Sequence, residues 1–75
     1  MTRSEKTIDS IHSAMTRARM WAGLTQAELA DLMCTTQSTI ARMESGGRYP
    51  NLTTLEKLAE VTGHRLEVRF IRDVN

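Results

Sequence analysis

Hydrophobic positions recur at helical spacing over most of the chain and at strand spacing only near its end. The first stripe repeats every three or four residues, which is the period of an amphipathic helix that buries one face. Its members are Ile8, Ile11, Met15, Ala18 and Ala22. We predict this helix from about Ser4, with Ser4 or Thr7 as its cap, to about Ala22, because Gly23 suits a left-handed C-terminal cap.

Two further helices follow with almost no connection between them. The segment TQAE, at 25–28, has the spacing of a capping box and predicts a helix over 25–33. Thr36 is an N-cap candidate for the next helix, over 37–44. The connection between them is so short that the two helices must cross steeply.

A fourth helix and one strand complete the predicted elements. The glycines and the proline of SGGRYPN end the third helix, and Asn51 caps LTTLEKLAEVT, which ends at Gly63. RLEVRFI then alternates apolar and charged residues from Leu66 to Phe70, the period of a half-buried strand. We expect one domain over 1–75, all-α with four to five helices over 4–63 and a C-terminal β-strand in the tail 64–75. A lone strand is not stable by itself and needs a partner.

Composition narrows the class of protein without naming a function. The 75 residues contain one cysteine and two histidines far apart, so neither an internal disulfide nor a metal site is expected. No apolar run approaches the roughly 20 residues of a membrane span, and no signal peptide is visible. The sequence also lacks paired carboxylates, a nucleophile with its base or a glycine-rich phosphate loop. We expect a soluble cytoplasmic protein that is not an enzyme, with no catalytic residue and no cofactor.

The third predicted helix has two chemically different faces. On a helical wheel Ile40 and Met43 fall on one side, whereas Gln37, Ser38 and Arg42 fall on the other. Glutamine pairs with adenine, arginine with guanine, and serine with several base edges, so this face suits the DNA major groove. A plain solvated face is the alternative, since polar outward faces are the rule for surface helices. The net charge of +1 does not decide between them.

The order of the motifs resembles the helix-turn-helix domain of the phage repressor and Cro-like (XRE) family. The matching segments, between Leu24 and Ala59, are LTQAELA, TTQSTIARMESG and RYPNLTTLEKLAE. In that family the second helix of the motif enters the major groove while the first crosses the DNA backbone. The resemblance therefore implies that the polar face reads bases.

Carried over by position, the resemblance assigns a role to individual residues. Base contacts fall to Gln37, Ser38 and Arg42. Backbone contacts fall to Gln26, Thr39, Gly46, Gly47, Arg48 and Asn51, through backbone N–H groups at the two glycines and at the N-terminus of the helix that Gln26 begins. For Gln26 an ordinary first-turn role is the alternative. Arg19 and Glu44 match a buried ion pair that ties the first helix to the end of the third.

Four residues remain outside this assignment. Cys34 occupies a turn position where the family most often has glycine, and we expect a small buried residue there, with a redox-sensing thiol as the alternative. Trp21 is most simply a core or interface group. His12 and His64 receive no role.

The C-terminal strand is expected to pair with its equivalent in a second copy. Leu66, Val68 and Phe70 share one face, and a twofold axis would pair two such strands antiparallel. The homodimer would hold its recognition helices roughly 34 Å apart and bind an inverted repeat. A disordered tail is the alternative.

The helix-and-strand arrangement also resembles antitoxin-type regulators such as the HigA and HipB families, which implies autorepression and a toxin protein as a further partner. We therefore predict a dimeric repressor that binds double-stranded DNA. The rival function is a protein-interaction module on the same fold that does not bind DNA.

Overall fold

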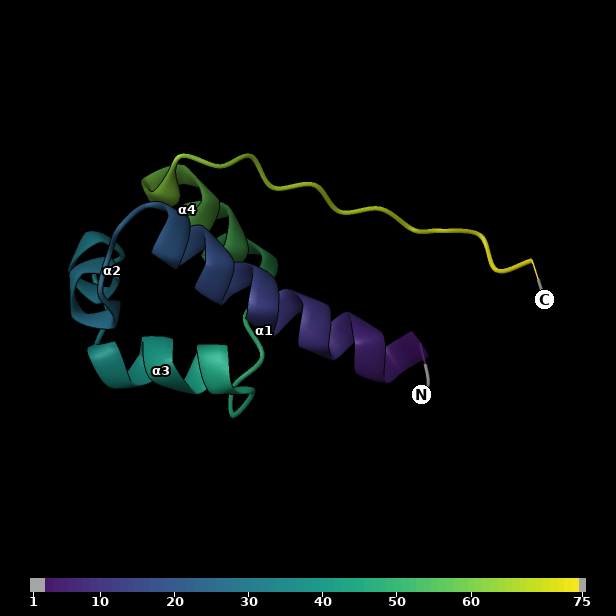
Figure 1. Cartoon of the computed structure of the whole chain (residues 1–75), viewed down its shortest axis with the longest axis horizontal. Coiled ribbons are helices and arrows are strands. Elements are labelled where there is room, and N and C mark those ends of the chain that lie inside the picture. The colour runs from purple at the N-terminus through teal and green to yellow at the C-terminus, as the bar shows by residue number, and fades with distance from the viewer. Residues whose placement is uncertain (1–2, 75) are drawn as a thin grey trace.

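The computed structural model of the chain describes the backbone of residues 3–74 and the side chains of residues 11–74. The described chain holds four helices, α1 (Arg3–Trp21), α2 (Gln26–Leu32), α3 (Gln37–Ser45) and α4 (Leu52–Thr62) (Figure 1). The four predicted helices are confirmed, and the described residues form no fifth. The side chains of Ser4, Thr7 and Ile8, expected to cap and pack α1, lie outside those described.

The short helices begin and end where the sequence provides caps. Thr25, Thr36 and Asn51 precede α2, α3 and α4, and each side-chain oxygen accepts the N–H group three residues later. At α2 the capping box is complete, because the Glu28 carboxylate also accepts the Thr25 N–H group at 2.8 Å. The helices α3 and α4 end at a left-handed glycine. Local sequence therefore fixes the length of the helices that form the site.

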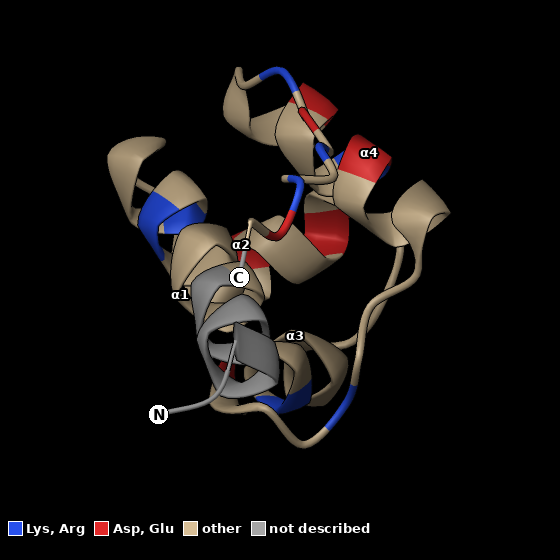
Figure 2. Ribbon diagram, turned by 90° about the vertical axis from the view of Figure 1, so that its right-hand side faces the viewer, with Lys and Arg blue, Asp and Glu red and all other residues tan. Residues whose placement is uncertain are grey.

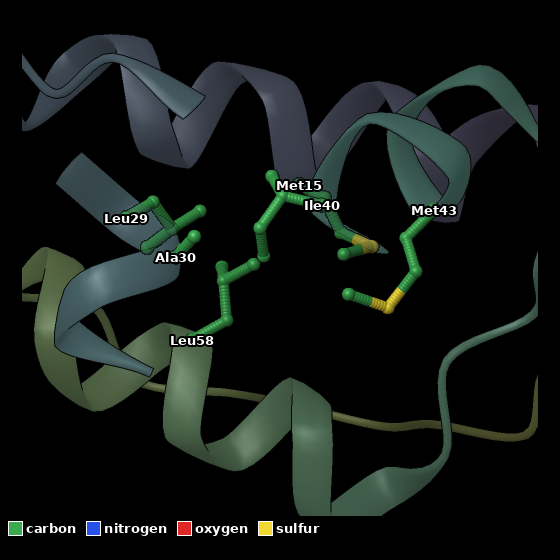
Figure 3. Packing of buried hydrophobic residues seen from close by; sticks show 6 residues of the cluster. All are labelled: Met15, Leu29, Ala30, Ile40, Met43 and Leu58. Carbon is green, nitrogen blue, oxygen red and sulfur yellow. The ribbon is translucent and has the colours of Figure 1, made fainter. Parts of the chain in front are cut away.

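One apolar cluster joins all four helices (Figure 3). Each helix contributes at least one side chain that is almost fully buried. These side chains are Met15 of α1, Leu29 and Ala30 of α2, Ile40 and Met43 of α3, and Leu58 of α4. Since α2 and α3 pack into the same cluster from opposite ends of a short turn, their relative orientation is set by the core.

The tail after α4 differs from the prediction. The strand expected over Leu66 to Phe70 is not formed, and residues 64–74 have neither helical nor strand structure. Figure 1 shows this segment extending from the end of α4 in the direction of the N-terminal half of α1. A strand requires a neighbour to accept and donate backbone hydrogen bonds, and no described residue of this chain supplies one. Pairing with a second copy stays a prediction.

Candidate nucleic-acid interface

The interface is built on the α2–α3 pair and the turn that joins it. The turn is closed by N–H groups of Cys34 and Thr35, which donate to the carbonyls of Asp31 at 3.2 Å and Ala30 at 2.9 Å. Cys34 has a φ of 55°, the left-handed conformation that the family resemblance implied. The expectation that Cys34 is buried is wrong, because its side chain is exposed on the outside of this tight turn. Trp21 is likewise 74% exposed and is not a core residue.

The helix α3 separates its apolar and polar groups as the wheel predicted. Ile40 and Met43 are buried, whereas Gln37, Ser38 and Arg42 are exposed. The core therefore orients the helix so that amide, hydroxyl and guanidinium groups point away from the protein. These groups can all hydrogen-bond to base edges.

Hydrogen bonds connect the first of these polar groups to the interior. The Gln37 Nε2 donates to Gln26 Oε1 at 3.1 Å, and the Gln26 Nε2 donates to Glu44 Oε1 at 3.2 Å. Gln26 stands at the start of α2 and Glu44 near the end of α3. The orientation of the Gln37 amide is thus set by a chain of side chains that begins inside the protein.

A two-pronged ion pair anchors that chain of side chains. The Arg19 Nε and Nη2 donate to the two carboxylate oxygens of Glu44 at 2.7 and 3.0 Å, and its Nη1 donates to the Leu24 carbonyl at 2.9 Å. The two side chains are only 14% and 6% exposed. The pair therefore fixes α1 to the C-terminal part of α3 with planar bidentate geometry.

The surroundings of Glu44 favour its charged form. Burial by itself would raise the pKa of this carboxyl, but hydrogen bonds from Arg19 and Gln26 and the charge of Arg19 outweigh it, so the pKa is lowered. The hydrogen bond to Glu44 correspondingly raises the pKa of Arg19. The anchor is thus an ion pair at neutral pH.

The hydroxyl of Thr36 organises the N-terminal turn of α3. It accepts the Thr39 N–H group at 3.2 Å and lies 3.2 Å from Ser38 Oγ and 2.9 Å from Thr39 Oγ1. Ser38 and Thr39 are therefore held by the cap itself. The Arg42 side chain, one turn further along, forms no hydrogen bond or ion pair with the described residues and is exposed.

The loop after α3 uses its own amides within the chain. The N–H groups of Gly46, Gly47 and Arg48 all donate to the Arg42 carbonyl, the latter two at 2.8 and 3.2 Å. The two glycine amides that were expected to bind phosphate therefore already donate within the chain, and a contact of this loop with phosphate stays a prediction. The exposed side chain of Arg48 is the cationic group that this loop leaves accessible.

A residue without an assigned role, His12, secures this loop from α1. The His12 Nδ1 lies 2.7 Å from the Met43 carbonyl, and because a carbonyl only accepts, Nδ1 carries the proton. The ring packs edge-on against Tyr49, and a Cβ atom added at Gly46 would lie 3.5 Å from it. The sequence offered a signal, since His12 falls on the same helical stripe as Met15 and Arg19.

A small polar cleft lies between α3 and the start of α4. It has a volume of about 140 Å³, and hydroxyl groups and one guanidinium line it. The lining residues are Met33, Thr35, Thr39, Met43, Arg48 and Thr54. Thr35 and Thr54 were not predicted, because the two residues come from separate elements and share no spacing in the sequence.

Charge is unevenly placed although its total is nearly zero. Figure 2 shows the basic positions of α3 and of the loop that follows it along one edge, and most acidic positions elsewhere. The acidic residue of α3, Glu44, is neutralised by Arg19. The edge that carries Arg42 and Arg48 therefore presents positive charge, as an interface with phosphates requires.

Other kinds of site find no support in the part of the chain that is described. No three His, Cys, Asp or Glu side chains there come together as a metal site would require. None of the described helices has both the length and the apolar character of a membrane span.

Comparison with known proteins gives one match. A family model described as helix-turn-helix matches residues 15–67, which includes α2, α3, α4 and the C-terminal part of α1. No curated protein and no solved structure matches the chain.

Proposed function

Because the chain belongs to the XRE-type helix-turn-helix family of DNA-binding transcription regulators, we propose that it is a sequence-specific repressor. It binds as a homodimer to an inverted-repeat operator. The observation that carries this proposal is the exposed polar face of α3, whose first side chain is held in place from the interior through Gln26 and Glu44. A merely solvated face would not need that support.

Base recognition falls to three side chains of α3. Gln37 can pair with adenine through the oxygen and the NH2 group of its side-chain amide. Ser38 offers a hydroxyl to several base edges, and Arg42 offers two parallel N–H donors to guanine. Gln37 and Ser38 are positioned before DNA binds, so they lose little side-chain freedom on binding.

Backbone phosphates are contacted on both flanks of α3. On one flank the side chain of Gln26 keeps a second Nε2 hydrogen for a phosphate oxygen. On the other flank Arg48, Thr39 and the polar cleft face the phosphates of the second DNA strand. The N-cap residue Asn51 uses its Oδ1 to cap α4 and offers its Nδ2 group to a phosphate there. At Gly46 and Gly47 we propose that the loop approaches the phosphate closely without donating its engaged amides.

Dimerisation uses the tail. An exposed extended segment with alternating apolar side chains suits pairing with an identical segment, and Leu66, Val68 and Phe70 would form the interface. Two copies related by a twofold axis place two recognition helices on successive turns of one DNA face.

An antitoxin-type role is the finer form of this proposal. It rests on the resemblance of the helix-and-tail arrangement to such regulators, and a toxin would dock on the folded surface, where Met20 and Trp21 of α1 are 65% and 74% exposed. The test is the neighbouring reading frame: a small protein that binds the purified chain supports the role, and a neighbour that does not bind removes it.

DNA binding is tested by selecting sites from a random pool and measuring affinity across a salt series. We expect a palindromic site, and affinity that falls steeply with salt because bound cations leave the phosphates. The Arg48→Ala variant should weaken all sequences alike and flatten the slope by about one. If no palindrome is preferred over bulk DNA, the repressor proposal fails and the protein-interaction module takes its place.

A further inference from the structure

The tail presents two faces of different chemistry and leaves its backbone unpaired. Val68 is 65% exposed, Phe70 101% and Ile71 86%, which is an unusual amount of apolar surface for one short segment. Within the described chain, residues 65–72 make no backbone hydrogen bond. On the other face Glu67 and Arg69 are exposed, and the Glu67 carboxylate lies 3.9 Å from the Arg65 guanidinium.

A groove of about 570 Å³ lies between this tail and the helices α1 and α4. The helices line it with apolar side chains, among them Ile11, Ala14 and Ala18 of α1 and Leu55 of α4. From the tail, Leu66 and Val68 line it together with the charged residues Arg65, Glu67 and Arg69, so the groove follows the tail along this stretch. A partner that pairs with the tail would also cover this groove.

Residues 66–70 of the tail are arranged symmetrically about Val68 in size and polarity, with charges of opposite sign. On either side of Val68 lies a charged residue, Glu67 before and Arg69 after, and beyond these lies a large apolar residue, Leu66 before and Phe70 after. In an antiparallel pair centred on Val68, each Glu67 stands opposite an Arg69 of the second copy, and each Leu66 stands opposite a Phe70. The side chains of Leu66, Val68 and Phe70 from both copies then share one face, and Ile71 lies on the other face with Glu67 and Arg69.

Neighbouring registers are worse for reasons of charge or packing. Centring the pair on Glu67 puts Glu67 opposite itself and Arg65 opposite Arg69. Centring it on Arg69 puts two arginines together. Centring it on Leu66 pairs Arg65 with Glu67 but places Phe70 opposite a residue of α4, which is already helical.

We propose that the tail is a self-complementary dimerisation strand whose register is centred on Val68, and that a second copy of this chain covers the groove. The proposal rests on the proposed homodimer and assigns the contacts within it. A second copy is the favoured occupant because an unrelated partner gives no reason for size and polarity to be symmetric, and charge opposite in sign, about one residue. Pairing also satisfies the tail backbone and covers Phe70.

Charge reversal tests the register on the full chain. Glu67→Arg places two arginine pairs in the homodimer, and Arg69→Glu places two glutamate pairs there, so each should weaken dimerisation by about tenfold or more. The double variant Glu67→Arg/Arg69→Glu restores both ion pairs and should dimerise like the original chain. Arg65→Glu is the matched control, because in the register centred on Val68 residue 65 stands opposite the uncharged Ile71 of the second copy.

Mixing the two single variants gives the sharpest result. In the mixed dimer every charge meets its opposite, so native mass spectrometry should show the heterodimer in excess over both homodimers. Sedimentation equilibrium gives the affinities, and circular dichroism verifies that each variant keeps its helices. The register is wrong, although the homodimer stands, if the original chain dimerises and the two single variants dimerise with the same affinity. It is also wrong if Arg65→Glu is the change that weakens dimerisation. If the chain is a monomer at every concentration, both fail.

Discussion

The two halves of α3 prepare for a ligand in different ways. At the N-terminal half, Gln37 and Ser38 are held by hydrogen bonds to Gln26 and to the Thr36 cap. At the C-terminal half, the Arg42 side chain is exposed and has no described partner. The Gln37 and Ser38 side chains are therefore held before a ligand binds, whereas the Arg42 side chain is not, and Gln37 owes its support to Glu44, which connects it to the interior through Gln26.

Removing the Glu44 carboxylate should have the largest effect. The Glu44→Ala change leaves the Arg19 charge buried and unpaired, and we expect the free energy of unfolding to fall by about 3–5 kcal/mol. Urea denaturation followed by circular dichroism measures it. Glu56→Ala, which removes an exposed carboxylate of α4, is the matched control and should change stability by about 0.5 kcal/mol or less. Equal effects from the two changes would show that the Arg19–Glu44 ion pair does not stabilise the fold.

Acid should remove the same contribution without a mutation. The pKa of Glu44 is lower in the folded chain, so its stabilising effect is complete above the unfolded pKa of about 4.3 and is lost as pH falls through the folded pKa. The pKa of Glu28 is lowered in the same sense by its capping-box hydrogen bonds with Thr25. Unfolding measured from neutral pH to about 3 should therefore show the original chain approaching the Glu44→Gln variant. Parallel curves would contradict this.

The proposed base contact of the Arg42 side chain is tested by the Arg42→Ala change. We expect a loss of about 1–3 kcal/mol on the selected operator and a relaxed preference at one base pair, because a bidentate contact to guanine disappears. Arg48→Ala removes the same charge from the following loop and should weaken operator and random DNA alike. Competition binding with both DNAs separates the two variants, and an equal loss on both DNAs from Arg42→Ala would remove it from the base readers.

The four helices were predictable because each carries local signals of its own. The hydroxyl or amide caps at Thr25, Thr36 and Asn51 and the glycines at 46 and 63 act within a few residues, and they mark helix ends wherever they occur. The strand was not predictable in the same way. Its alternation is also local, but a strand forms only with a neighbouring strand, and no described residue of the same chain supplies one.

The candidate site was predictable in part. The outward residues of α3 follow from the period of one helix, whereas the role of His12, the cleft that Thr54 lines and the engaged amides of the loop depend on how α1, α3 and α4 meet. Cys34 is a second case in which local sequence was not sufficient. Its left-handed backbone agreed with a family pattern, but its exposure depends on the path of the turn.

The smallest expected effect concerns the hydrogen bond between Gln37 and Gln26, which holds the Gln37 side chain in place. If Gln26 orients Gln37, the two residues are coupled, and a double-mutant cycle of Gln26→Ala and Gln37→Ala on operator binding should give a coupling energy of about 0.5–1 kcal/mol. The stability of each variant is measured alongside, because Gln26 also donates to Glu44. If Gln26 contacted only phosphate, its loss would add independently to that of Gln37. Strict additivity would therefore show that Gln26 does not orient Gln37, and the contrast between Gln37 and Arg42 would end.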